Sequence, residues 1–160
     1  MSISSEDENY MRLCMLIDIA RQAVQVHFDK EFHPDRLTKE IKTKGYNILL
    51  RLYRKNVITE TQWKILKGDN LKSTDFDIPL MICILKNLIP NIDISNVLPH
   101  SSLVKPTDDI ARIKFHRNAI VHANRRWLSD EKFLEIWENV CEVSNGEVEW
   151  NPNLILNPQF

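Results

Sequence analysis

The sequence predicts an all-α protein, an up-and-down bundle of four long helices with one or two short ones. Apolar residues recur at helical spacing in successive stretches, and no stretch alternates apolar and polar residues as a half-buried strand does. The 3 glycines and 7 prolines indicate long regular elements with few tight hairpins. With 160 residues, 43% of them hydrophobic and 27% charged, the chain is most simply one soluble domain with a single core.

Two helices are expected in the first third of the chain. The first runs from Tyr10 to Phe28, and its apolar side chains fall at helical spacing: Leu13, Leu16, Ile17, Ala20, Val24 and Phe28. The second runs from about Asp35 to Asn56, and Pro34 fits its first turn. The pair Lys44-Gly45 leaves room for an interruption within this second helix.

A short helix and a longer apolar one follow. Thr59 and Gln62 have the spacing of a capping box, which opens a short helix carrying Trp63, and Gly68 stops it. Residues 73–77 offer several caps for the next helix. The apolar residues of that helix are Ile78, Met81, Ile82, Leu85 and Leu88.

Residues 91–106 form a long irregular connection, a length that in compact domains is often functional. Thr107 is the expected cap of the next helix, which extends to Asn124 and has Asp108 and Asp109 near its positive end. Residues 129–131 start the last helix. Its apolar residues are Phe133, Ile136, Trp137 and Val140.

The predicted domain covers residues 10–143, between a disordered start at 1–9 and an extended tail or linker at 144–160. The tail offers no closing element, so we expect the chain to be part of a longer protein. The acidic, polar N-terminus is no signal peptide, and the longest apolar run, at 78–89, is too short to span a bilayer. We therefore expect a cytoplasmic protein without a membrane partner, although a nuclear one fits equally well.

The net charge of −1 provides no global basic field, so any RNA binding must come from a local patch. Cys14, Cys83 and Cys141 are far apart, and each lies in an apolar helical pattern, which favours buried reduced thiols. No CxxC pair or paired-histidine spacing indicates zinc. We expect neither a metal nor a cofactor.

Arg117 is the most unusual residue of the helix expected at 107–124. The apolar stripe of that helix is formed by Ile110, Ile113, Ile120 and Val121, and Arg117 falls on it, four residues after Ile113. Burying an unpaired guanidinium is expensive. Arg117 should therefore meet an acidic partner, a phosphate or a second protein surface.

The chain resembles HEPN domains, helical domains that carry an R-x4-6-H motif on the penultimate helix. Arg117-Asn118-x-x-x-His122 has that form. Together with the block Asp108–Asn118, Gln62-Trp63 and residues 73–77, it resembles one branch, the HEPN domain of the DAZ-interacting zinc-finger type of E3 ubiquitin ligase. The branch also occurs in multidomain animal proteins of innate-immunity type. The resemblance covers roughly residues 10–142, and the chain carries no RING finger or other ubiquitin-ligase element.

Active HEPN domains are metal-independent endoribonucleases, and the resemblance implies roles for three residues. His122 would move a proton as the ribose 2′-hydroxyl attacks phosphorus, or would protonate the leaving 5′-oxygen. Arg117 would hold the phosphate, and Asn118 would orient the imidazole ring or the phosphate. Five residues separate Arg117 from His122, about 140° around a regular helix. One helix therefore converges them poorly, and the family's solution is a homodimer with facing motifs.

Two functions from different classes remain open. The first is RNA binding with cleavage of single-stranded RNA. The local patch would then consist of Arg112, Lys114, His116, Arg125, Arg126 and Trp127. The second is a non-catalytic dimerisation or interaction module of a larger ubiquitin-ligase-like or signalling protein. In that case Arg117 pairs with a carboxylate and His122 caps the helix end. The charged residues of the patch then form a solvated helix face followed by a basic C-terminal end, and Trp127 packs into the core.

Overall fold

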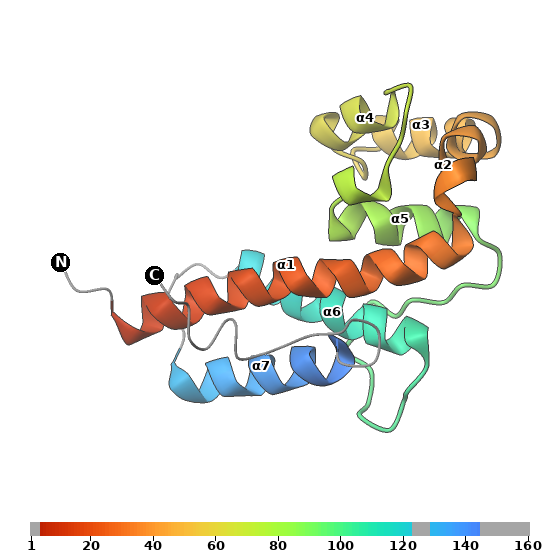
Figure 1. Cartoon of the computed structure of the whole chain (residues 1–160). Coiled ribbons are helices and arrows are strands. Elements are labelled where there is room, and N and C mark those ends of the chain that lie inside the picture. The colour runs from red at the N-terminus through yellow and green to blue at the C-terminus, as the bar shows by residue number, and fades with distance from the viewer. Residues whose placement is uncertain (1–3, 123–128, 145–160) are drawn as a thin grey trace. The chain divides into compact units, whose positions relative to one another are not determined.

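The computed structural model describes residues 4–122 and 129–144, with the backbone alone for 141–144. These residues form helices and no strand, so the all-α prediction is confirmed (Figure 1). The elements are α1 (Ser5–Glu31), α2 (Pro34–Glu40), the π-helical turn η1 (Ile41–Gly45), α3 (Tyr46–Arg54), α4 (Glu60–Leu66), the 3-10 turn η2 (Ser73–Asp75), α5 (Ile78–Leu88), α6 (Pro106–Val121) and α7 (Asp130–Ser144). None of these helices is long and apolar enough to cross a membrane.

The chain divides into two compact units. One consists of α1 as far as Ala23 and the segment from Ser95 onward, with α6 and α7, and we call it the α6–α7 unit. The other covers Val24–Ile94, with the end of α1 and the elements from α2 to α5, and we call it the α2–α5 unit. Each has its own set of buried apolar side chains.

Helix α1 begins at Ser5, five residues before the expected start, so residues 5–9 are helical rather than disordered. The hydroxyl of Ser4 accepts a hydrogen bond from the N–H of Asp7 at 3.2 Å, which satisfies one donor of the first turn. Glu6, Asp7 and Glu8 place negative charge at the positive end of the helix dipole. Local capping and charge therefore extend the helix beyond its apolar stripe.

The second predicted helix consists of three consecutive elements, α2, η1 and α3. Pro34 occupies its first turn as expected, and the π-helical turn ends at Gly45, within the pair where an interruption was allowed. A Cβ on Gly45 would lie 2.5 Å from Cδ2 of Leu88 on α5. The glycine therefore permits the close approach of α5 to this helix.

Helices α4 and α5 are joined through their N-terminal caps. The predicted capping box is confirmed: Thr59 N–H donates to Gln62 Oε1 at 2.9 Å, and Gln62 N–H donates to Thr59 Oγ1 at 3.2 Å. Gln62 Nε2 also donates to both carboxylate oxygens of Asp77, at 3.0 and 3.1 Å. Asp77 in turn caps α5 by accepting the N–H of Leu80 at 2.8 Å.

In the α6–α7 unit, α6 packs beside α7 (Figure 1). The cap of α6 is Lys105 rather than the expected Thr107, and the Lys105 N–H donates to Asp108 Oδ2 at 3.0 Å. Asn9 Nδ2 of α1 donates to Asp130 Oδ1 of α7 at 2.6 Å. The four apolar residues predicted for α7 are all buried.

Two of the three cysteines lie among the described side chains. Cys14 and Cys83 are free thiols, and both are half-buried rather than fully buried. The thiol of Cys83 has a raised pKa because burial disfavours the thiolate, which makes it a weak nucleophile. Ser144, the first residue of the predicted tail, is the last residue of α7. The rest of that tail, residues 145–160, and the Cys141 side chain lie outside the described residues.

Candidate functional site

The burial pattern of α6 differs from the predicted stripe. Ile110, Ile113 and Ile120 are buried as expected, but Val121 is 53% exposed. His116 takes its place in the core, together with Ala111. The core-facing side of α6 is therefore rotated away from Val121 and toward His116. Because this side packs within the unit, it is not a surface available to a second subunit.

Arg117 lies at the edge of the packed side of α6 and is half-buried. Its Nη1 donates a hydrogen bond to Oδ1 of the neighbouring Asn118 at 3.1 Å. Across residues 4–122 and 129–140, no carboxylate forms an ion pair with Arg117. Its described partner is thus a neutral amide, and the acidic partner required by the structural interpretation is missing from this part of the chain.

His122 is the residue that ends α6. It has φ −92° and ψ 3°, and its N–H donates to the carbonyl oxygen of Asn118 at 3.0 Å. The imidazole is exposed, while Asn118, one turn earlier, is half-buried. Asn118 therefore connects Arg117 and His122: its amide holds the guanidinium, and its backbone holds the C-cap that carries the imidazole.

Apolar side chains lie exposed beside this motif. Phe115 is 42% exposed, and Ala119, one turn further along α6, is exposed as well. His122 falls on the same side of the helix, three residues after Ala119. A phenyl ring and a methyl group next to an exposed imidazole form a surface that a second protein chain can cover with little desolvation cost.

Arg112 has a structural role that the sequence did not reveal. Its Nη1 donates to Asp109 Oδ1 at 2.8 Å, and its Nη2 donates to the carbonyl oxygens of His100, at 2.8 Å, and Leu103. The side chain is only 11% exposed. Arg112 thus fastens the long connection before α6 to the helix, and it does not offer its charge to a ligand.

Lys114 is engaged with the same connection. Its Nζ donates to the side-chain oxygen of Asn96 at 2.8 Å. The prediction that positive groups of α6 gather into one exposed patch is therefore not met by Arg112 or Lys114. Arg125, Arg126 and Trp127, the remaining predicted RNA contacts, lie outside the described residues.

His116 is 3% exposed, so its ring lies in the core and not on the predicted patch. It packs edge-on against Phe115, with ring centroids 5.4 Å apart, and Nε2 has no hydrogen-bond partner among the described residues. Burial lowers the pKa of His116 below 6.5; Lys132 of α7 lowers it further, and Glu135 opposes this. A neutral imidazole can occupy this place, whereas an imidazolium is disfavoured there.

Metal-ligating side chains do not cluster in the part of the chain that the structure describes: it contains no group of three or more His, Cys, Asp or Glu side chains suited to an ion. Arg117, Asn118 and His122 lie within about one and a half turns of α6, where Arg117 contacts the side chain of Asn118 and His122 contacts its carbonyl oxygen. Their chemistry is that of phosphate binding and proton transfer.

Comparison with known families gives a match over most of the chain. A family model described as DZIP3/hRUL138-like HEPN matches residues 34–144, more than half of the chain. The matched segment runs from the start of α2 to the end of α7 and contains the whole α6 motif. No curated protein and no solved structure matches the chain.

Proposed function

The chain belongs to the DZIP3/hRUL138-like HEPN family, and we propose that it binds single-stranded RNA and cleaves it at a site on α6. The site consists of Arg117, Asn118 and His122 from each of two subunits. It requires no metal ion, because the nucleophile is a hydroxyl of the RNA itself. Two findings support the proposal: the chain belongs to a HEPN family, and the three side chains are arranged on α6 in a way that suits phosphate binding.

The observation that carries the proposal is the pairing of Arg117. A half-buried guanidinium that bonds to a neutral amide, with no carboxylate partner among the described residues, keeps its full charge for a ligand. Its remaining N–H groups suit two oxygens of one phosphate. Asn118 fixes the direction of the guanidinium before RNA binds, which lowers the ordering cost on binding.

The reaction is an internal transfer of the phosphate. The ribose 2′-oxygen attacks the adjacent phosphorus, the bond from phosphorus to the 5′-oxygen breaks, and a 2′,3′-cyclic phosphate forms. One imidazole accepts the proton of the 2′-hydroxyl, and another donates a proton to the departing 5′-oxygen. Arg117 stabilises the negative charge that grows on the phosphate oxygens. Two proton carriers are needed, and a dimer provides two copies of His122.

The dimer is proposed to form through the exposed side of α6. Arg117 and His122 are about 140° apart around the helix, so the guanidinium of one subunit meets the imidazole of the other more easily than its own. Phe115 and Ala119 lie exposed next to His122 and would be covered in such a pair. A two-fold axis is the commonest closed arrangement for a homodimer.

The second candidate is a dimerisation or interaction module without catalysis, acting within a larger signalling or ubiquitin-ligase-like protein. The exposed Phe115 and Val121 favour it, since both are explained by an interface alone. The net charge of −1 also favours it, because it provides no general attraction for RNA. Both candidates use the same dimer and differ only in what the motif does.

Cleavage separates the two candidates. Labelled single-stranded RNA is incubated in excess EDTA with the wild-type chain, with Arg117→Ala and with His122→Ala. The matched control is His100→Ala, which removes an exposed histidine of the same unit that lies outside the motif. The proposal expects a cyclic phosphate end in the wild type and the control, and a rate about 100-fold or more lower in both motif variants. Intact RNA in all four reactions, with a stable wild-type dimer, favours the interaction module.

A further inference from the structure

Positive charge is concentrated in residues 36–72, from α2 to the segment before η2. This stretch holds ten lysines and arginines against three acidic residues, Glu40, Glu60 and Asp69. The whole chain has a net charge of −1, so the rest of the protein is acidic. The basic part of the molecule therefore lies in the α2–α5 unit and not on α6, the helix that carries the Arg117–His122 motif.

Two hydrogen bonds fold this stretch back on itself. The N–H of Leu71 donates to Thr38 Oγ1 at 2.9 Å, and Nζ of Lys42 donates to the carbonyl oxygen of Leu66 at 3.0 Å. Thr38 and Lys42 are about one turn apart, so the helix formed by α2 and η1 runs along residues 66–71. The bonds bring the lysines of α2 and η1 close to those that follow α4.

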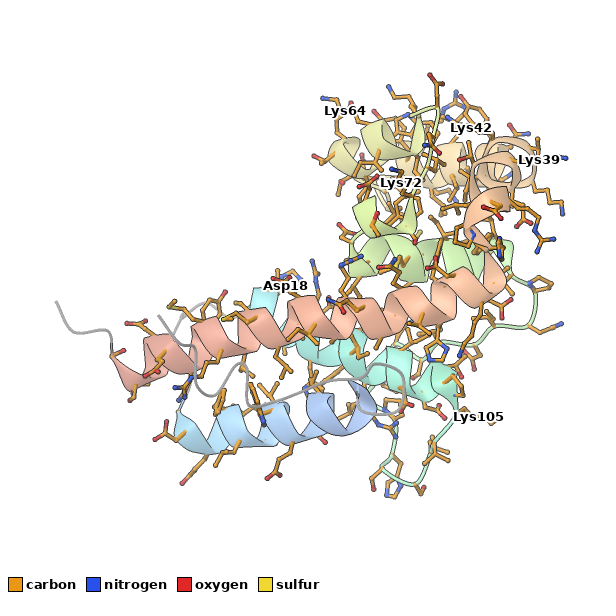
Figure 2. The ribbon with its side chains drawn as sticks, viewed as in Figure 1. Asp18, Lys39, Lys42, Lys64, Lys72 and Lys105 are labelled. Atoms are coloured by element: carbon orange, nitrogen blue, oxygen red, sulfur yellow. The ribbon has the colours of Figure 1, made fainter. Side chains whose placement is uncertain are left out.

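Five lysines lie on these adjoining segments, and we call them the lysine cluster: Lys39, Lys42, Lys64, Lys67 and Lys72. Figure 2 labels four of them, on α2, η1, α4 and the segment before η2. All are exposed except Lys42, which is half-buried and whose ammonium caps the last carbonyl of α4. None of the five forms an ion pair with a described residue.

The lysine cluster places like charges on neighbouring segments, and like charges repel one another. Glu40 and Asp69 lie next to the cluster and offset part of its charge, but they leave a positive excess. The capping of α4 explains the position of Lys42. It does not explain the other four lysines, whose ammonium groups form no hydrogen bond or ion pair with a described residue. An anionic ligand would remove the repulsion and release the counter-ions that the cluster holds in solution.

An aromatic ring lies beside the cluster. Tyr46 is 42% exposed and follows Lys42 by about one turn, and its ring centroid is 5.9 Å from that of Trp63, the neighbour of Lys64. Trp63 is itself stacked on Tyr53 and fixed in the core between α3 and α4. The exposed ring is therefore held in place by a rigid neighbour, next to cations from two segments.

We propose that the lysine cluster and Tyr46 form a binding site for the phosphate backbone of a single-stranded nucleic acid. The lysines contact successive phosphates, and Tyr46 offers a face on which one base stacks. An anionic membrane fits less well, since membrane-binding surfaces bury large apolar side chains. Within residues 24–94, the exposed large hydrophobic side chains are Tyr46 and Val57 alone.

This site shares no residue with the α6 motif. A negative result for nucleic-acid binding at the lysine cluster can therefore be told apart from a negative result for RNA cleavage at α6. Binding is measured on the full chain carrying His122→Ala, which keeps the RNA intact if cleavage does occur. The probes are a fluorescent oligouridine, its DNA counterpart and a polyglutamate peptide, each titrated at several salt concentrations. Melting curves establish that every variant is folded.

The cluster variant is Lys39→Gln/Lys67→Gln/Lys72→Gln. Its matched control is Arg12→Gln/Lys105→Gln/Lys132→Gln, which removes the same charge from the α6–α7 unit. Each phosphate contact contributes about 0.7 to the slope of log affinity against log salt for a single strand, so losing three should lower the slope by about 2. We expect affinity to fall at least tenfold in the cluster variant and to change little in the control.

The ring is tested separately. Tyr46→Ala should weaken binding about fivefold or more through lost stacking, and Tyr46→Phe should bind as the parent does. Equal affinity for RNA and DNA indicates recognition of the phosphate backbone alone, and a preference for RNA adds a contact to the 2′-hydroxyl. The proposal is overturned if the cluster variant keeps full affinity, if the control loses as much, or if polyglutamate binds as tightly as the nucleic acids.

Discussion

Arg117 donates its Nη1 hydrogen bond to the side-chain oxygen of Asn118, the next residue on α6, at 3.1 Å. Five residues earlier on the same helix, Arg112 donates to a carboxylate and to two backbone carbonyls. Two arginines on one helix therefore have opposite surroundings. The guanidinium of Arg112 stabilises the fold. Arg117 keeps N–H groups without a hydrogen-bond partner and a charge without a counter-charge among the described residues. This contrast makes the two arginines a matched pair for mutagenesis.

Arg117→Ala should cost no more than about 1 kcal/mol of unfolding free energy, because it removes one hydrogen bond to a neutral group. Denaturant unfolding followed by circular dichroism measures this change. The same variant should lose RNA cleavage. A loss of about 3–5 kcal/mol would instead reveal a buried carboxylate partner, and the phosphate interpretation of Arg117 would then be abandoned.

Arg112→Ala should cost more, about 2–3 kcal/mol, because a half-buried carboxylate and two carbonyls each lose a charged donor. The connection before α6 should also become easier to cleave with a protease, since Arg112 fastens His100 and Leu103 to the helix. Arg112→Lys should rescue only part of the loss, because an ammonium cannot reproduce the fork of the guanidinium. Equal stability of Arg112→Ala and the wild type would contradict this role.

Gln62→Glu should destabilise the α2–α5 unit by about 2 kcal/mol or more. The isosteric change removes both hydrogen bonds to Asp77 and places a second carboxylate against it in a buried position. The loss should shrink as the pH falls, when the two carboxyls share a proton. Thr59→Ala provides the comparison: it removes the cap alone, should cost about 1 kcal/mol, and should show no such recovery in acid.

His116 should make the protein less stable in mild acid. Burial, aided by Lys132, holds the pKa of His116 below 6.5 in the folded protein, so the unfolded chain binds the proton more readily. The contribution of His116 is therefore fully present above pH 6.5. It is lost as the pH falls through the lowered pKa, and it changes no further below that value. His116→Leu keeps the other four histidines, so the difference between the two pH profiles of unfolding free energy reports His116 alone.

Phe115→Glu should convert the proposed dimer into a monomer without unfolding it. The side chain is substantially exposed, so a charge there costs little in the isolated subunit but places like charges together across a two-fold axis. Light scattering across a concentration series measures the change, with Leu134→Glu on α7 as an exposed control. A wild-type chain that stays monomeric well above micromolar concentration contradicts the dimer in both functional proposals.

Several features follow from the sequence alone because their causes are local. The all-α class, the capping box at Thr59 and Gln62, the first-turn place of Pro34 and the break near Gly45 are set by residues within one or two turns. The buried residues of α7 follow from periodicity, since that helix has one clear apolar side. In α5 four of the five predicted residues are buried, but Leu88 is half-buried, and Leu80 and Ile84 are buried as well because the helix is covered on more than one side. The DZIP3/hRUL138-like HEPN family, too, was recognisable from the block around Arg117.

The buried side of helix α6 could not be predicted from the sequence, because the spacing of its apolar residues fits two orientations of the helix. His116 and Arg117 both lie between Ile113 and Ile120 at helical spacing, and only packing decides which one enters the core. The imidazole of His116 is buried, since it can be neutral. The guanidinium of Arg117 always carries its charge, and it stays half-buried at the edge of the packed side.

The partners of Arg112 and the lysine cluster also depend on contacts between distant residues. Arg112 bonds to carbonyls nine and twelve residues away. The segments that carry the lysine cluster lie side by side because Leu71 bonds to Thr38 and Lys42 to Leu66. A sequence gives the charge of each residue, but it does not show which distant segments lie side by side in the fold. Which segments become neighbours depends on how all the apolar side chains are buried together, and this packing sets the positions of the lysines and arginines.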